Sequence, residues 1–131
     1  MRVERQLTLI LENRPGVLAD VCADLAQAKI NIKGIYVENL VDHSAVRVVV
    51  SDPDKAMHLL GAAGVLVFEN EIVAVPVENR PGTLAAIARR LGKARVNIDY
   101  MYASTPDRGK AVIFLAVSNV KRAGEALKGY R

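Results

Sequence analysis

The chain has 131 residues, of which 51% are hydrophobic and 24% are charged, a composition that fits a folded protein and excludes a disordered one. The net charge of +4 is modest and the lysines and arginines are scattered, so the dense basic patch typical of nucleic-acid binding is missing. A single cysteine excludes an internal disulfide and predicts a cytoplasmic location. The apolar runs are too short to cross a bilayer and no signal peptide is recognised, so we expect no membrane partner.

The first half of the chain predicts four strands and two helices. β-prone apolar segments alternate with two stretches of helical periodicity. The turn Asn-Arg-Pro-Gly precedes the first helix, and its proline is suited to a helix start. In chain order we expect a strand at 6–11, a helix from Pro15, strands at 31–38 and 45–51, a helix at 55–60 capped by Asp52, and a short strand at 65–68.

The sequence then repeats itself. The pentapeptide Glu-Asn-Arg-Pro-Gly at 12–16 recurs at 78–82, and 12 of the 25 positions from Glu12 to Tyr36 are identical 66 residues further on. Shorter matches continue downstream: Ala45-Val46 with Ala111-Val112 at the same shift, and Val50-Ser51 with Val117-Ser118 after a slip of one residue. We therefore predict two copies of one unit, as domains at 1–69 and 70–131.

The second copy repeats the element order but ends early. A hairpin turn is expected at Asp107-Arg108-Gly109 and a second helix at 123–127, after which four residues remain. Its fourth strand is therefore missing or supplied elsewhere. Only Glu69-Asn70-Glu71 separates the last strand of the first copy from the first strand of the second, so we expect closely coupled units.

This element order predicts an α+β fold of two ferredoxin-like βαββαβ units. Each unit has an antiparallel sheet with its helices on one face. The apolar strands and the incomplete second copy leave surface to cover, so we also expect a homodimer.

The residues resemble the ACT domain, a small regulatory module of amino-acid metabolism. The resemblance rests on a strand ending in Glu-Asn-Arg-Pro-Gly, an amphipathic helix, and Asn-Ile at the start of the next strand, and it covers the chain twice. It implies units that pair side by side and bind a small ligand, usually an amino acid, at the pair interface. Free-standing tandem ACT proteins are the most similar, because no catalytic domain is attached.

The candidate ligand site begins at the start of the first helix of each copy. The first N–H groups of a helix lack intrahelical partners, and glycine allows a carboxylate to approach the amides of residues 16–18 or 82–84. The asparagine of each motif offers a donor and an acceptor to a zwitterion. By resemblance, the Asn-Ile pairs form a second wall, often against a partner unit. The candidate residues are Asn13, Arg14, Pro15, Gly16, Val17, Leu18, Asn31, Ile32, Asn79, Arg80, Pro81, Gly82, Thr83, Leu84, Asn97 and Ile98.

Structural interpretations of the same residues stay open. Asn13 and Asn79 are also suited to capping a helix, Pro-Gly to forming the turn, and Asn31 and Asn97 to turns after a helix. We assign no catalytic residue, metal ligand or cofactor. His43 and His58 stand apart in the sequence, and Cys22 is expected as a buried structural thiol.

The sequence thus predicts a non-catalytic sensor of a small free amino acid, which acts through its own oligomer or through a regulated enzyme or transcription factor. Val17, Leu18 and Ile32 give an apolar wall without selecting one amino acid. The alternatives are an interaction module that has lost its ligand and an RNA-binding sheet. The aliphatic segments 45–51 and 111–118 do not favour RNA.

Overall fold

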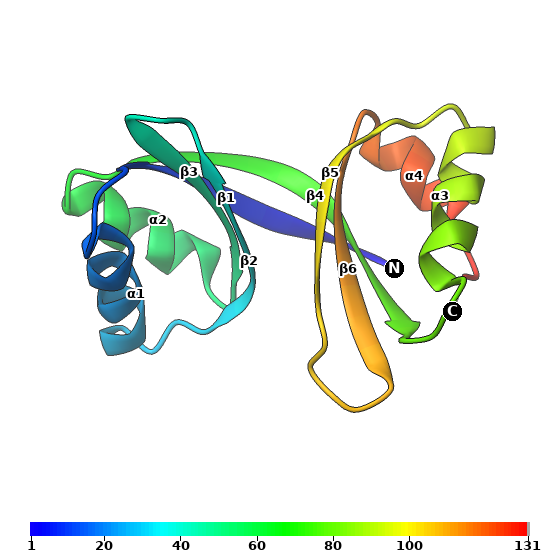
Figure 1. Ribbon diagram of the computed structural model, residues 1–131, viewed down its shortest axis with the longest axis horizontal. Helices are drawn as coiled ribbons and strands as arrows, with labels where there is room; N and C mark the ends of the chain where they lie inside the picture. Colours follow the sequence, from blue (N-terminus) through cyan, green and yellow to red (C-terminus); the bar gives the residue numbers. More distant parts are fainter. Residues whose placement is uncertain (131) are drawn as a thin grey trace. The chain divides into compact units, whose positions relative to one another are not determined.

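The computed structural model describes residues 1–130 and confirms the predicted α+β fold (Figure 1). All strands and helices expected from the sequence are present. In chain order the elements are β1 (Arg2–Glu12), α1 (Val17–Gln27), β2 (Ile32–Asn39), β3 (His43–Val50), α2 (Pro53–Ala62), β4 (Leu66–Glu78), α3 (Thr83–Lys93), β5 (Ile98–Ser104), β6 (Lys110–Val117) and α4 (Val120–Ala126).

The chain forms two compact units. The first unit is Arg5–Asn70, and the second is Met1–Glu4 together with Glu71–Arg131. The strand order is β2-β3-β1-β4 in the first unit and β5-β6-β4-β1 in the second. The N-terminal segment of β1 therefore takes the place of the fourth strand that the second copy lacks. The ranges 1–69 and 70–131 remain our prediction for the domains.

The strand β4 corrects one expectation about the junction between the copies. Glu69-Asn70-Glu71 is part of a single strand of 13 residues and does not form a break. These three residues are exposed, so a strand accommodates their polar side chains without burying them. The segment also lacks glycine and proline, the residues that most often interrupt a strand.

The sheet register corrects the alignment of the two copies. Glu12 pairs with His43, and Glu78 pairs with Lys110, a shift of 67 residues between the two partners. The extra residue of the second copy therefore lies in its hairpin loop, before β6. By the register Ala45 corresponds to Val112, and the match of Ala45-Val46 with Ala111-Val112 is wrong.

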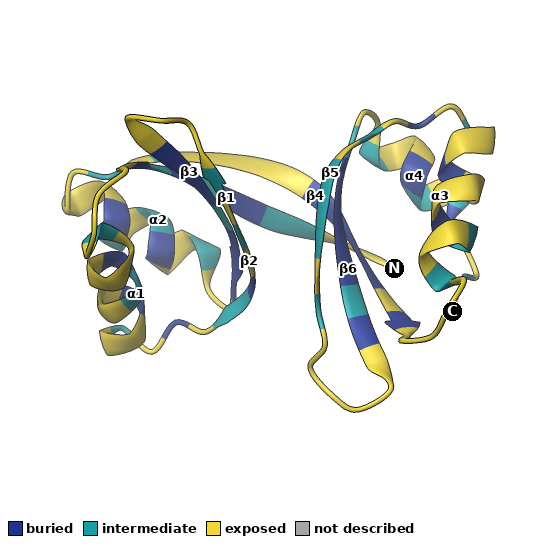
Figure 2. Cartoon of the chain, viewed as in Figure 1, coloured by how far each residue is buried: buried dark blue, intermediate teal, exposed yellow. Residues whose placement is uncertain are grey.

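Each unit has its own hydrophobic core between the helices and one face of its sheet. Alternate residues of the strands enter this core, as period-two patterning requires. The first core contains Leu7, Leu9, Leu11, Val21, Leu25, Val46, Val48 and Leu60. The second contains Val73, Val75, Val77, Ile87, Leu91, Ile113, Leu115 and Leu127. The buried stretches of the strands and the exposed outer faces of the helices are visible in Figure 2.

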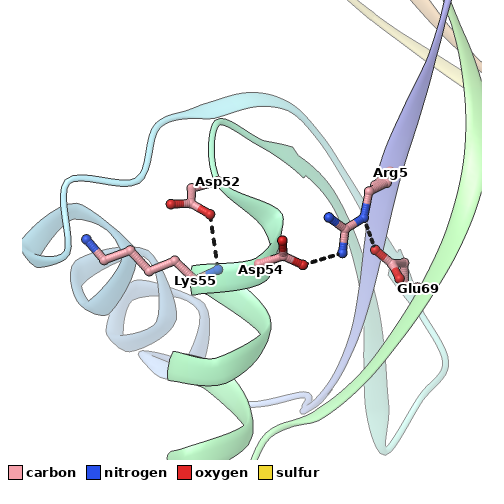
Figure 3. A network of polar contacts seen from close by, with 5 residues as sticks. All are labelled: Arg5, Asp52, Asp54, Lys55 and Glu69. Atoms are coloured by element: carbon pink, nitrogen blue, oxygen red, sulfur yellow. Dashed lines mark hydrogen bonds and ion pairs between the residues drawn. The ribbon is translucent and has the colours of Figure 1, made fainter.

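A charged network joins three elements of the first unit (Figure 3). Nη2 of Arg5 on β1 donates to Oδ1 of Asp54 on α2 at 2.7 Å, and its Nε donates to Glu69 on β4. The hydrogen bond from Arg5 lowers the pKa of the Asp54 carboxyl. The predicted cap of α2 is confirmed, because Oδ1 of Asp52 accepts from the N–H of Lys55 at 3.1 Å.

Candidate functional site

The repeated motif forms the same backbone turn in both units. Gly16 and Gly82 are the residues before the first helical position, with φ of 89° and 91°. This left-handed region is disfavoured for residues with a Cβ atom, which accounts for glycine at both positions. Pro15 and Pro81 lie in the turn and do not start the helix. No side chain caps either helix, so the interpretation of the two asparagines as helix caps is wrong.

In the first unit, the polar side chains of the motif bond to the protein itself. Nδ2 of Asn13 donates to Oδ1 of Asn39 and to the carbonyl of Val41, both at 2.9 Å. Nε of Arg14 donates to Oε2 of Glu12 at 2.6 Å, and this hydrogen bond lowers the pKa of the Glu12 carboxyl. Both side chains therefore have structural partners before any ligand arrives.

The hairpin between β2 and β3 explains the role of Asn13. Val41 has φ of 75°, in the left-handed region that β-branched residues rarely adopt. Oδ1 of Asn39 accepts from the N–H of Val41 at 2.8 Å, as well as from Asn13. The two asparagines hold the strained hairpin in place.

In the second unit, the equivalent side chains have no such partners. Within residues 1–130, neither the amide of Asn79 nor the guanidinium of Arg80 makes a hydrogen bond or ion pair with another residue. Glu78 accepts from Nζ of Lys110 at 3.2 Å, so its carboxylate does not engage Arg80. The second hairpin has its positive φ of 74° at Gly109, which needs no support from Asn79.

A cavity of about 200 Å³ lies beside these two side chains. Four of its lining residues belong to the predicted site, namely Asn79, Arg80, Thr83 and Leu84. The others come from the end of β4, from β5 and β6, and from the loop between β5 and β6: Val77, Glu78, Met101, Ala103, Thr105, Ala111 and Ile113. The sequence analysis missed the β5 residues, although period-two alternation places Met101 and Ala103 on one face of the strand.

The start of α3 also offers backbone N–H groups as hydrogen-bond donors. Among residues 1–130, no partner accepts from the N–H groups of Gly82 and Leu84, and the N–H of Thr83 makes only a long bond of 3.3 Å to the Arg80 carbonyl. Oγ1 of Thr83 donates to the Glu78 carbonyl at 3.0 Å and so fastens the helix start to β4. The segment 79–84 therefore combines unpaired backbone donors, a guanidinium and a side-chain amide.

The predicted second wall lies elsewhere in each unit. Asn97 stands just beyond the C-terminal end of α3, a helix of 11 residues and therefore about 16 Å long. Its N–H donates to Oγ of Ser118 at 2.9 Å, and Asn31 makes the same bond to Ser51. The adjacent residues Ile32 and Ile98 pack against the two cores. The structure does not bring the Asn-Ile pairs together with the Pro-Gly turns within a unit.

Other chemistry has little support in the described residues. No group of three or more His, Cys, Asp or Glu side chains in residues 1–130 is placed to hold a metal ion. No helix in that range is long and apolar enough to cross a membrane. Cys22 is half-buried and not buried as expected. Tyr102 stacks on Phe114 with ring centroids 5.1 Å apart, which supports a packing role.

Residues 1–128 match the sequence model described as the ACT domain pair. Protein BT0572 from Bacteroides thetaiotaomicron is 33% identical, with a TM-score of 0.91 over 96% of this chain and 87% of that one. The ligand-free regulatory subunit of aspartate kinase from Thermus thermophilus is 16% identical, with a TM-score of 0.70 over 97% of this chain and 95% of that one. The aspartate kinase from Synechocystis is 23% identical, with a TM-score of 0.61 over 95% of this chain and 26% of that one. No curated protein matches the sequence.

Proposed function

Because the chain belongs to the ACT domain pair family, we propose that it is a non-catalytic regulatory sensor that binds a free amino acid in its second unit. One observation carries the choice of unit. Asn79 and Arg80 line a cavity and have no partners within residues 1–130, whereas Asn13 and Arg14 are already bonded. A ligand in the second unit therefore does not have to displace an existing contact.

The chemistry around the cavity matches the two charges of an amino acid. The carboxylate accepts from the Arg80 guanidinium and from the unpaired N–H groups at the start of α3, which carries partial positive charge. The ammonium donates to Oδ1 of Asn79 and to the Glu78 carboxylate, which retains acceptor sites beside Lys110.

The apolar part of the lining selects the ligand's side chain. Leu84, Met101 and Ile113 contribute hydrophobic surface, and no charged residue comes from the β5 side. The volume of about 200 Å³ is below the range of drug-sized sites. We therefore propose an amino acid with a small or medium apolar side chain as the ligand.

Signalling requires that the ligand favour one arrangement of the protein or its partner over another. We propose a homodimer that engages a regulated enzyme or a transcription factor in the cytoplasm. An enzyme is the first partner class, since the fold is shared with a regulatory subunit of aspartate kinase. The first unit, with its motif side chains bonded, supports the alternative of a pure interaction module for that half of the chain.

A thermal-shift screen of the twenty amino acids on the full chain tests the proposal. A ligand at one hundred times its Kd adds about 2.7 kcal/mol to the free energy of unfolding. Arg80→Gln is expected to remove the shift, and the matched control Arg14→Gln to retain it. If no amino acid shifts the melting temperature or gives heat in calorimetry, the sensor is rejected and the interaction module takes its place.

A further inference from the structure

A second and larger cavity lies in the second unit and shares Arg80 with the smaller one. Its volume is about 730 Å³, within the range of small-molecule binding sites. Met1, Pro76, Val112 and Tyr130 form apolar walls, and charged side chains complete the lining. The apolar walls together with a few polar groups are the usual composition of a ligand site.

Four charged side chains line this cavity, and two of them neutralise each other. Glu78 and Lys110 form an ion pair at 3.2 Å. Arg80 has no ion-pair partner in residues 1–130. The Asp107 carboxylate accepts from the N–H of Arg108 at 2.8 Å, but no cationic side chain in the described chain pairs with it. Among its side chains, the cavity therefore presents one unpaired cation and one unpaired anion that are not bonded to each other.

The first unit has a cavity in the equivalent place with different electrostatics. Its volume is about 340 Å³, and Glu12 and Arg14 line it as Glu78 and Arg80 line the larger one. Here the two charges form an ion pair with each other at 2.6 Å. Duplication therefore preserved the pocket, while only the second copy retains unpaired charges of both signs.

Because this cavity has more than three times the volume of the smaller one, we propose that it binds a zwitterion larger than a single amino acid. The simplest such ligand is a dipeptide with an apolar side chain. Arg80 receives its carboxylate in a paired, two-pronged geometry, and Asp107 receives its ammonium. The apolar side chain lies against Pro76, Val112 and the ring of Tyr130.

The ring of Tyr130 is held in position to form this wall. The Arg90 guanidinium lies 5.1 Å from the ring centroid, and the phenol oxygen donates to the Thr83 carbonyl at 3.4 Å. Tyr130 thereby also contacts the first residue of α3, which lines the smaller cavity. A fixed aromatic surface loses little conformational entropy when a ligand binds to it.

Calorimetry with the dipeptide Gly-Phe on the full chain tests this site. We expect Gly-Phe to bind, and N-acetyl-Gly-Phe and Gly-Phe amide, which each lack one charge, to bind roughly 10- to 150-fold more weakly. Asp107→Asn keeps the bond from Arg108 and is expected to weaken binding by a similar factor. The control Asp42→Asn, in the first hairpin, is expected to leave the affinity unchanged.

Two variants separate this site from the amino-acid site. Val112→Phe fills the larger cavity and is expected to remove Gly-Phe binding while a free amino acid still binds. Ala103→Leu fills the smaller cavity and is expected to do the reverse. Absence of Gly-Phe binding to the wild type, or unchanged affinity in Asp107→Asn, overturns the dipeptide site without touching the amino-acid proposal.

Chemical-shift mapping of the wild type keeps the test valid if Val112→Phe fails to fold. Titration with Gly-Phe is expected to shift the signals of Met1, Val112 and Tyr130 more than those of Ala103 and Met101. The largest shifts at any other place in the chain reject the site.

Discussion

The two copies of the Asn-Arg-Pro-Gly turn have nearly the same backbone, but their asparagine and arginine side chains are bonded in one copy and unbonded in the other. Gly16 and Gly82 differ in φ by only two degrees. Asn13 and Arg14 are bonded within the first unit, whereas Asn79 and Arg80 have no partner in residues 1–130. A repeated motif therefore does not imply a repeated site, because the neighbouring hairpin decides which side chains remain available.

The cause lies in two differences between the copies outside the motif. Val41 in the first hairpin has a strained φ that needs support, and Asn13 supplies part of it. In the second hairpin Gly109 takes the positive φ without strain. At the start of the third strand, Lys110 replaces His43 and engages Glu78, so Arg80 loses the partner that Arg14 has.

The largest expected effect is a loss of stability in the cores, and it tests whether the two units differ only at the motif. Leu25 and Leu91 are fully buried equivalents on α1 and α3. Leu25→Ala and Leu91→Ala are each expected to lower the free energy of unfolding by about 2–5 kcal/mol, measured by urea denaturation. If one of the two variants loses almost no stability, the cores of the two units differ as well. The contrast between the copies would then extend beyond the motif and its hairpin.

The next effect separates binding from stability at the two asparagines. Asn79→Ala is expected to weaken amino-acid binding by about 1.5–3 kcal/mol, because an ammonium loses its acceptor, and to leave the melting temperature unchanged. Asn13→Ala is expected to lower stability by about 1 kcal/mol and to leave the affinity unchanged. Calorimetry measures the affinity of both variants, and thermal melts measure their stability. If Asn13→Ala weakens binding and Asn79→Ala lowers stability, the ligand site belongs to the first unit.

The fold is largely predictable from the sequence because it depends on local patterns. The order βαββαβ follows from apolar periodicity, and Asp52 caps the second helix as its sequence signal indicates. The first helix begins at Val17 and not at Pro15, because the proline belongs to the preceding turn. The continuous β4 was not predictable, since Glu69-Asn70-Glu71 reads as a linker until its exposure in the strand is known. The origin of the fourth strand also required the structure, because residues 1–4 lie far from the second copy in sequence.

The candidate site was predictable only in part. The segment 79–84 does line a cavity, but Asn97 and Ile98 lie beyond the opposite end of α3. The sequence also cannot distinguish Asn13 from Asn79, which are identical residues in identical motifs. Their difference arises from the φ of Val41 and from the one-residue insertion in the second hairpin, which are properties of the folded backbone.

A third effect, about 1 kcal/mol in size, tests the strained hairpin directly. Val41→Gly is expected to make Asn13 dispensable, because glycine adopts a positive φ without support. The cost of Asn13→Ala in the Val41→Gly background should then fall well below its cost in the wild type. A double-mutant cycle by urea denaturation measures the coupling. Additive losses would mean that Asn13 stabilises the protein for another reason. The strained hairpin would then not explain why Asn13 bonds within the protein.

The smallest effect concerns pH and belongs to the first unit. Hydrogen bonds from Arg14 and Arg5 lower the pKa values of the carboxyl groups of Glu12 and Asp54 in the folded state. A carboxyl with a lowered pKa contributes stability above its unfolded pKa and loses it as the pH falls through the folded value, so the loss is expected below about pH 4. These groups are exposed, so salt is expected to screen the contribution. Urea denaturation measures the free energy of unfolding at neutral and at acidic pH. The decrease on acidification should be smaller in Arg14→Gln and Arg5→Gln than in the wild type.

Arg80→Gln is the matched control from the second unit, where the guanidinium has no carboxylate partner in residues 1–130. Its stability should decrease on acidification by as much as that of the wild type. An equal reduction in Arg80→Gln and Arg14→Gln would show that the two arginines are paired alike in solution and would remove the basis for placing the ligand in the second unit.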